Sequence, residues 1–594
     1  MKTNERKIES VVREHFKKYE DQIILEEQIS DNELINSLLK SASKNKNNKH
    51  GFPEFIIRIK KKPNLLLVIE CKPEIRFHIS DTLQNTKQYA VDGAIWYGEK
   101  LKKEFDVISI GVSGDSLQNL LVSHNLHLKN NETYDLSISK LLSIDSYIEL
   151  YDKDERKVRQ DYDSLISYSD KLNKRLFELK IPEPDRALLL SAVLIALNNK
   201  RFIDSFKECE LSSELCSLLV NVVETEMKKN NLDNYSIETV IKSFNFICNN
   251  PFFTKDITIL SDLIREIDTN VNQFVQTKKY YDILGQFYVK FLEKCNSDKK
   301  LGIVLTPNHI TEFMGDLVHL SSESVLYENC TGTGGFVISG IKKMIDSSSG
   351  EFEVKEKIKN QNFIGVEYQP QIYSLLVCNM MLNGLSPSNV IRGNSFDPEI
   401  IEKVKQKKPN CATINPPYDG NELEFIENAL DCIQINGKVA AIVPMSTAIS
   451  TNKTDVLLRE RILSKHTLEA VVSMPNELFH NSKAGVVTCI MVLTSKIPHS
   501  NNKETFFAIF KEDGFEKRKH LGRIDVKNKW GQIKNDFLEM YENRKIVPNV
   551  STMKKVRHND EWCAEYFLET DYSELTEKDF ELTLKSFILA NQLK

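Results

Sequence analysis

The chain has 594 residues, and its length alone predicts about three to five domains, because a single compact core does not grow to this size. With 41% hydrophobic and 27% charged residues, its composition is that of a soluble globular protein, and its longest apolar run, residues 187–197, is too short to span a bilayer. The net charge of −5 neither supports nor excludes a nucleic-acid partner, since DNA-binding enzymes often confine basic charge to one face.

The N-terminal region lacks the apolar core of a signal peptide, since residues 1–7 read MKTNERK, so we expect a cytoplasmic protein with no membrane segment. The eleven cysteines include no Cys-x-x-Cys pair, which argues against a zinc site and for reduced thiols. Apolar periodicity predicts helices over residues 5–40, and a lysine- and asparagine-rich loop follows at residues 44–51.

Two strand candidates come next, at residues 55–59 and 65–72. Side chains alternate along a strand, so Glu70 and Lys72 share one face of the second candidate. Glu54 stands immediately before the first candidate and directly after a proline. Taken alone, Glu-x-Lys favours a half-buried strand that carries a solvated ion pair.

This arrangement, Pro-Glu followed after fifteen residues by Glu-x-Lys, resembles the PD-(D/E)xK nucleases, and we assign residues 1–149 to a nuclease-like α/β domain. The resemblance implies a Mg²⁺ site formed by Glu54, Glu70 and the backbone carbonyl of Cys71, because carboxylate and carbonyl oxygens are hard ligands. Lys72 would orient or activate the attacking water. Glutamate at position 54 departs from the commoner aspartate, a change that the family tolerates.

The residues that follow are predicted to be mostly helical. Residues 84–89 (QNTKQY) resemble a helix that many of these nucleases carry after the Glu-x-Lys strand. Strand character is expected to end after Ser113, and residues 150–283 are patterned as a helical connector, with Glu-Pro-Asp as a start signal before the helix at 187–197. This connector carries no recognisable chemistry, so we expect it to act as a spacer and to dock a partner.

Strands and helices alternate over residues 284–530, which predicts a doubly wound, Rossmann-like parallel sheet. One strand runs into the glycine turn of ENCTGTGGF, residues 328–336, where a ligand can approach the backbone at a helix N-terminus. The next strand ends at Glu367, whose carboxylate suits a ribose diol, and a third ends near Asn394. A lone Gly-x-Gly is weak evidence, so the order of these features carries the argument.

The fourth strand of this region ends in Asn415-Pro416-Pro417-Tyr418. The prolines fix φ, remove two amide donors and push the residue before each of them into an extended conformation. The result is a rigid rim in which the Asn415 side-chain oxygen and the Pro416 carbonyl can accept both N–H bonds of an exocyclic amine, while Tyr418 stacks on the ring. These acceptors make the amine a better nucleophile without a covalent intermediate. Taken alone, a proline-stiffened loop explains the tetrapeptide equally well.

The order LTP, ENCTGTGGF, VEYQPQ, NPPY and GKVAAIVP within residues 284–530 resembles the N6-adenine DNA methyltransferases, above all the modification subunits of type I restriction systems. The resemblance implies S-adenosylmethionine as the methyl donor and double-stranded DNA as the substrate. The target adenine must leave the duplex to reach Asn415, because its amino group is otherwise paired. Tyr418 would replace the lost stacking, which is worth about 1–3 kcal/mol per base.

The same resemblance assigns residues to the cofactor. Thr306 and Pro307 would lie near its amino-acid end, the glycine turn against its methionine portion, Glu367 on its ribose hydroxyls, and Asn394 facing its adenine. The complete set is Thr306, Pro307, Glu328, Gly332, Thr333, Gly334, Gly335, Glu367 and Asn394. Glu328-Asn329 departs from the usual Asp-Pro, and Asn394 from the usual Asp. A nicotinamide cofactor fits worse, since the chain has no full Gly-x-Gly-x-x-Gly.

Residues 531–594 are predicted to form a helical tail, and only 94 residues follow Ser500, too few for a target-recognition domain as well. We therefore expect a separate specificity subunit, a hetero-oligomer, and a tail that is a candidate docking surface. The whole chain resembles the combined restriction-modification subunit of BcgI-like type IIB systems, which implies adenine methylation together with Mg²⁺-dependent cleavage of unmodified DNA. Two alternatives stay open: a modification-only methyltransferase with a non-cutting N-terminal domain, and a scaffold without turnover.

Overall fold

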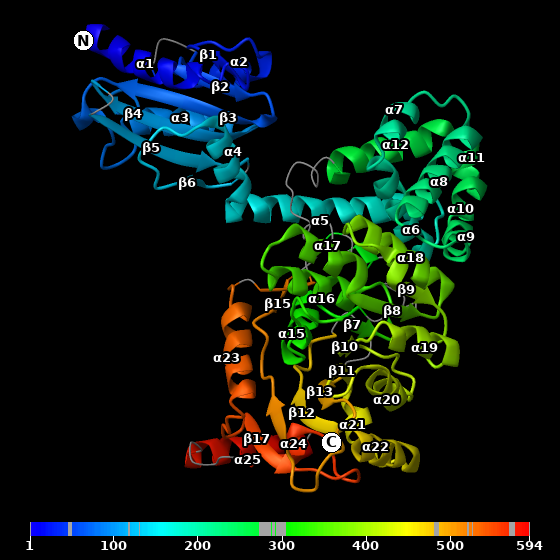
Figure 1. Cartoon of the computed structure of the whole chain (residues 1–594). Coiled ribbons are helices and arrows are strands. Elements are labelled where there is room, and N and C mark those ends of the chain that lie inside the picture. The colour runs from blue at the N-terminus through cyan, green and yellow to red at the C-terminus, as the bar shows by residue number, and fades with distance from the viewer. Residues whose placement is uncertain are drawn as a thin grey trace. The chain divides into compact units, whose positions relative to one another are not determined.

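Figure 1 presents a computed structural model of the chain. The structure describes residues 2–44, 50–116, 119–129, 131–272, 287, 291–292, 305–479, 486–518, 522–525, 527–569 and 576–592. Most of the lysine-rich loop (45–49) and nearly all of the expected start of the second catalytic domain (284–304) lie outside the described residues. The chain divides into two compact units, residues 1–163 and 164–594.

The first unit is built on a six-stranded sheet in which neighbours in sequence are also neighbours in space. Its strands are β1 (Ile23–Glu26), β2 (Phe55–Ile59), β3 (Lys62–Lys72), β4 (Asp106–Gly114), β5 (Leu120–His127) and β6 (Thr133–Asp135). The β3–β4 pair is parallel, and α3 (Ala90–Leu101) lies in the crossover between these two strands. The other described pairs are antiparallel.

Alternation along β3 directs its side chains into two separate cores. Leu67 and Ile69 pack in the same core as α1 (Lys2–Lys17) and α4 (Ile144–Lys153). Leu66 and Val68 pack on the other face, with α2 (Glu33–Leu39) and α3. Glu70 continues this second series, so β3 presents its carboxylate on the face that α3 covers.

Three predictions for this unit are wrong. β1 lies inside the stretch predicted to be helical, residues 5–40, and pairs with β2. β5 and β6 follow Ser113, where strand character was expected to end. Residues 84–89 form turns rather than a helix, and the buried Asp92 of α3 accepts the backbone N–H of Asn85 at 2.8 Å, which anchors the segment by hydrogen bonds other than those of a helix.

The predicted connector, residues 150–283, is helical in its described part. It contains α5 (Glu155–Glu178), α6 (Glu183–Leu197), α7 (Lys200–Ser205), α8 (Ser212–Lys229), α9 (Asn234–Ser243), α10 (Asn245–Asn249), α11 (Pro251–Lys255), α12 (Ile257–Ile267) and a π-helical turn (Asp268–Asn272). α6 packs against α18 (Pro370–Leu382), and Tyr373 on α18 donates to Ser236 on α9 at 3.0 Å. The helices from α6 onward therefore lie in the second unit, whereas α5 begins in the first.

Nine strands form the sheet of the second unit, in the order β17-β14-β12-β13-β11-β10-β7-β8-β9. They are β7 (Leu326–Glu328), β8 (Phe363–Glu367), β9 (Val390–Arg392), β10 (Cys411–Ile414), β11 (Lys438–Pro444), β12 (Thr467–Ser473), β13 (Thr488–Thr494), β14 (Glu504–Ile509) and β17 (Ser551–Lys555). The prediction of a parallel sheet is corrected to a mixed one, because β13 runs antiparallel to β11 and β12 and β17 antiparallel to β14. A separate hairpin joins β15 (Glu516–Arg518) to β16 (Gly522–Ile524).

Helices cover both faces of this sheet (Figure 1). α19 (Pro398–Gln406), α20 (Glu422–Cys432) and α22 (Lys453–Lys465) pack in one core. Four further helices contact strands β7 to β11 outside that core. They are α15 (Asn308–Leu317), α16 (Gly335–Asp346), α17 (Phe352–Gln361) and α18. Later helices are α21 (Met445–Ala448), α23 (Trp530–Glu542), α24 (Ala564–Phe567) and α25 (Glu577–Gln592). The tail predicted as wholly helical, residues 531–594, is corrected by β17, which joins the sheet at its edge.

The strand order creates a crevice at one point of the sheet. From β7 the chain continues to β8 and β9 on one side, and β10 then pairs with the other side of β7. In open α/β sheets, ligands bind where the strand order reverses in this way, beyond the carboxyl ends of the strands. Both ENCTGTGGF and NPPY begin at that edge. Among the described residues, no helix is long and apolar enough to cross a bilayer.

Candidate active sites

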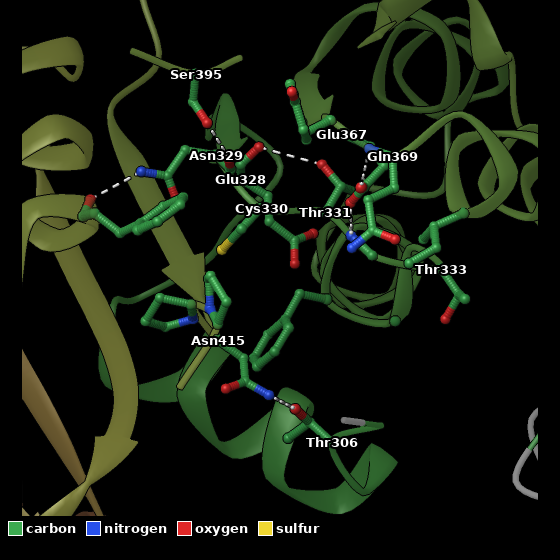
Figure 2. Close-up of a pocket in the computed structure, with 18 of the residues that line it drawn as sticks. Thr306, Glu328, Asn329, Cys330, Thr331, Thr333, Glu367, Gln369, Ser395 and Asn415 are labelled. Carbon is green, nitrogen blue, oxygen red and sulfur yellow. Dashed lines mark hydrogen bonds between the residues drawn. The ribbon is translucent and has the colours of Figure 1, made fainter. Parts of the chain in front are cut away.

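A cavity of about 510 Å³ opens at this crevice (Figure 2). It brings together most of the residues predicted for the second domain, which are Thr306, Glu328, Gly332, Thr333, Gly335, Glu367, Asn394, Asn415, Pro416, Pro417 and Tyr418. Pro307 and Gly334 are not among the lining residues and instead occupy the N-cap positions of α15 and α16. The predicted site is therefore assembled from the ends of β7, β8 and β10 and from the start of α15.

The glycine turn after β7 places backbone amides next to a carboxylate. Glu367 at the end of β8 accepts the N–H of Gly332 through one oxygen and the N–H of Gln369 through the other, each at 2.8 Å. Gly334 has φ +89°, a left-handed conformation that only glycine adopts without strain. Burial raises the pKa of Glu367 above its ordinary value. The carboxylate is thus fixed in place by the turn that it faces.

Glu328 at the end of β7 contributes a second carboxyl group to the cavity. It is 1% exposed, and its Oε2 has no hydrogen-bond partner among the described residues. Burial, reinforced by the charge of Glu367, raises the pKa of Glu328 well above its ordinary value. A buried polar atom without a partner is costly, which makes this oxygen a candidate contact for a ligand.

Asn329, where the resemblance led us to expect proline, ties three segments together. Its Nδ2 donates to the Phe425 carbonyl at 2.8 Å and to Asn428 Oδ1 at 2.9 Å. Ser395 donates its hydroxyl to the Asn329 carbonyl at 2.5 Å, a bond drawn in Figure 2. Asn329 Oδ1 remains buried and has no described partner. The substitution therefore keeps the turn in place by hydrogen bonds that a proline side chain could not form.

The NPPY loop presents one acceptor toward the cavity. Asn415 donates its Nδ2 to the Thr306 hydroxyl at 2.9 Å, while its Oδ1 is buried and has no partner among the described residues. Tyr418 lies edge-on to Phe479, with the ring centroids 6.4 Å apart. Burial raises the pKa of the Tyr418 hydroxyl, which stays neutral. A free carboxamide oxygen beside an aromatic ring can receive a planar amine.

Asn394 is less enclosed by the site than predicted. It lines the cavity but is exposed, and its Oδ1 accepts the N–H of Phe396 at 3.1 Å within its own loop. The sequence interpretation also missed other lining residues, among them Asn329, Cys330, Thr331, Phe336, Tyr368, Gln369, Asn379 and Ser395. Of these eight, all but Asn379 directly follow or adjoin a motif residue, which was the available signal. Asn379 sits on α18 and carried none.

The residues predicted for the nuclease site also meet, in the first unit. Lys72 Nζ lies 3.5 Å from Glu70 Oε1 and 3.9 Å from Glu54 Oε1. Glu54 Oε2 accepts the backbone N–H of Cys71 at 3.4 Å. Lys44 was predicted only as part of the lysine-rich loop. In the structure it forms an ion pair with Glu70, and its Nζ lies 4.3 Å from the centroid of the Tyr97 ring.

The two carboxyl groups of this site differ in their electrostatics. Burial, the charge of Glu70 and a hydrogen bond with it raise the pKa of Glu54 well above its ordinary value. Burial acts upward on the pKa of Glu70 too, but Lys44, the hydrogen bond with Glu54 and Lys72 together lower it. Glu70 is buried and Glu54 half-buried, and two adjacent carboxyl groups of this kind fit a hard divalent cation. Among the described residues, no group of three or more His, Cys, Asp or Glu side chains could hold a metal ion.

Comparison with known proteins bears mainly on the second unit. A family model described as N-6 DNA methylase matches residues 279–424 and 416–594. The HindI methylase subunit of a type I restriction enzyme from Haemophilus influenzae is 22% identical over 311 residues, which cover 47% of this chain and 66% of that protein. A solved structure that concerns assembly and conformational transition of a type I restriction-modification system covers 72% of this chain and 96% of its own, with 16% identity and a TM-score of 0.51. That likeness shows the fold.

One relative extends over both units. The type II restriction enzyme and methyltransferase RM.BcgI of Heyndrickxia coagulans is 28% identical over 613 residues, covering 95% of this chain and 93% of its own length. The alignment therefore includes the unit that carries Glu54, Glu70 and Lys72 as well as the unit that carries NPPY.

Proposed function

The chain belongs to the N-6 DNA methylase family, and we propose that it transfers a methyl group from S-adenosylmethionine to N6 of adenine in double-stranded DNA. The observation that carries this proposal is the Asn415 side chain, which lines the cavity and whose carboxamide oxygen is buried and unpartnered among the described residues. An amine N–H is a donor that can satisfy this acceptor.

The cavity suits the cofactor through its own residues. Glu328 and Glu367 offer carboxylates, and Gly332 and Gly335 leave open space in front of the backbone, since a Cβ there would meet no atom within 4 Å. Asn329 Oδ1 and Glu328 Oε2 are buried polar atoms without a hydrogen-bond partner among the described residues, so a bound ligand could satisfy them. When bound, the cofactor supplies an electrophilic methyl group on a sulfonium. Pro307, Thr333, Gly334 and Asn394 complete the set proposed for the cofactor.

The chemistry then follows from the NPPY loop. An adenine turned out of the duplex would donate its two N6 hydrogens to Asn415 Oδ1 and the Pro416 carbonyl, while Tyr418 stacks on its ring. Both acceptors draw the N6 lone pair out of conjugation with the ring, so that it could form the new bond to the methyl carbon while the carbon–sulfur bond breaks and the sulfonium leaves as a neutral thioether. The methylated amine would then lose one proton to solvent. Pro416 and Pro417 bring no N–H that could compete for the acceptors.

We also propose that the first unit cuts unmodified DNA with Mg²⁺ held by Glu54, Glu70 and the Cys71 carbonyl. The support is the convergence of Glu54, Glu70 and Lys72 and the relative, itself described as a restriction enzyme, whose alignment covers 95% of the chain. Bound Mg²⁺ would polarise the phosphate, and Lys72 would orient the water. The competing proposal is a modification-only enzyme whose first unit binds but does not cut.

Cleavage and methylation are separated by variants in one site at a time. Plasmid DNA, S-adenosylmethionine, Mg²⁺ and the separately encoded specificity subunit are incubated with wild type, Glu70→Ala or Lys72→Ala. We expect both variants to lose cleavage by at least about 100-fold while retaining methyl transfer, because each removes a group that contacts the reacting phosphate or its metal. Glu74→Ala, an exposed carboxylate just beyond β3, is the matched control and should cut normally. A wild type that methylates but never cuts supports the modification-only enzyme.

Target choice is proposed to come from that specificity subunit, in a hetero-oligomer with this chain. α25 offers a surface for such a contact, because Phe580, Leu584, Phe587 and Ile588 recur at helical spacing and are between 46% and 65% exposed. An exposed apolar row of this kind commonly marks a protein interface.

A further inference from the structure

A carboxamide has two ends, and only one orientation of Asn415 serves methyl transfer. With Oδ1 toward the cavity, the side chain accepts an N–H from the substrate amine. With Nδ2 in that place, two donors would face each other and the amine would be repelled. Since the two prolines that follow carry no N–H, their backbone offers no donor to Asn415 Oδ1. Something else must select the orientation.

Thr306 provides the selecting contact. Its Oγ1 accepts a hydrogen bond from Asn415 Nδ2 at 2.9 Å, and Figure 2 draws this bond between the two side chains. With the nitrogen engaged, Oδ1 is left buried and without a partner among the described residues. We propose that Thr306 is a positioning residue, which holds the Asn415 carboxamide in the orientation that accepts the exocyclic amine of the substrate base. This inference rests on the proposed methyl transfer.

The position of Thr306 is itself held from a distant part of the sequence. Thr306 precedes Pro307, the N-cap of α15, and His309 in the first turn of that helix is 8% exposed. His309 Nε2 lies 3.1 Å from Asp513 Oδ2, and its ring stacks on Phe515 with centroids 3.8 Å apart. Arg523 donates to both oxygens of Asp513, at 2.6 and 2.8 Å.

Asp513, Phe515 and Arg523 lie about 200 residues beyond Thr306 in the sequence. They clamp the start of α15, and α15 fixes the loop that carries Thr306. The resemblance had placed Thr306 beside the cofactor's amino-acid end. The two roles make different kinetic predictions, because a cofactor contact changes cofactor binding, whereas a positioning contact changes turnover.

The test compares Thr306→Val, which removes the hydroxyl at nearly constant shape, with Thr306→Ser, which keeps it. We expect Thr306→Val to lower kcat for methyl transfer about tenfold, as loss of one positioning hydrogen bond would. The Kd for S-adenosylmethionine, measured by calorimetry, should stay within about twofold of wild type. Thr306→Ser should recover most of kcat. Thr467→Val is the control, since it deletes another buried hydroxyl bond, to the Ile497 carbonyl at 2.7 Å, away from the cavity.

Three outcomes overturn the inference. One is a Thr306→Val variant with normal kcat and a raised cofactor Kd, which would make Thr306 a cofactor contact only. Another is a Thr306→Ser variant as slow as Thr306→Val, while both unfold at the wild-type temperature. The third is a wild-type chain that transfers no methyl group to DNA, which overturns the proposed function as well. The first two leave that function standing.

Discussion

At the scale of single residues, two of the carboxyl groups that line the cavity, those of Glu328 and Glu367, lie in contrasting surroundings. Glu367 accepts two backbone N–H groups, whereas Glu328 has an oxygen without a described partner and is more deeply buried. Burial raises the pKa of both, and the pKa of Glu328 rises further. A carboxylate held by amides can accept hydrogen bonds from neutral hydroxyls, and a carboxyl group kept protonated by burial can ionise when a cationic group binds beside it.

Glu328→Gln should therefore change how stability depends on pH. The folded state of the unliganded wild type keeps the Glu328 proton above the pH at which the unfolded chain releases it. This stabilisation is complete below the ordinary carboxyl pKa and is lost as pH rises through the raised value. Calorimetry without cofactor between pH 5 and 8 should show wild type losing stability relative to Glu328→Gln. Glu460→Gln, on the exposed face of α22, is the control. A difference that is constant with pH would contradict this account.

At the scale of elements, the motifs predicted the cavity better than they predicted the sheet. β7, β8, β9 and β10 and the loops after them were predicted because glycine, proline and terminal carboxylates mark the strand ends. The direction of β13 was not predictable, since an apolar run does not encode whether a strand is parallel. β1 was missed because its four residues lie between helical stretches and are too few to show the alternation of apolar and polar residues that marks a strand. Thr306, Asn415 and Asp513 lie far apart in the chain, so only the fold reveals their connection.

The turn before α16 gives a prediction at this scale. A Cβ at Gly334 would lie 2.7 Å from Leu376 Cδ1, and the residue has φ +89°. Gly334→Ala should cost about 1–2 kcal/mol from the left-handed backbone alone and more from crowding, and should weaken S-adenosylmethionine binding. Gly350→Ala, at φ +87° in open space, isolates the backbone cost. Thermal unfolding measures the loss of stability and calorimetry the loss of cofactor affinity. Equal losses of stability in the two variants would refute the crowding.

At the scale of the whole molecule, each compact unit carries its own candidate site, and α25 presents an apolar row. Phe580→Ser combined with Phe587→Ser should weaken binding of the specificity subunit at least about tenfold, because each substitution removes a large apolar contact. Cofactor affinity should not change, since α25 contributes no residue to the cavity. Sedimentation or calorimetry with the purified subunit makes the measurement. Undiminished binding would place the contact elsewhere.

The central claim, that Asn415 directs methyl transfer to adenine N6, is tested most directly by nucleoside analysis. DNA incubated with the chain, its specificity subunit and isotopically labelled S-adenosylmethionine is digested and separated by mass spectrometry. We predict N6-methyladenine with wild type and with Asn501→Ala, an exposed control, and a loss of at least about 100-fold with Asn415→Ala. Label on another base, or an Asn415→Ala variant that methylates at the wild-type rate, would contradict the account.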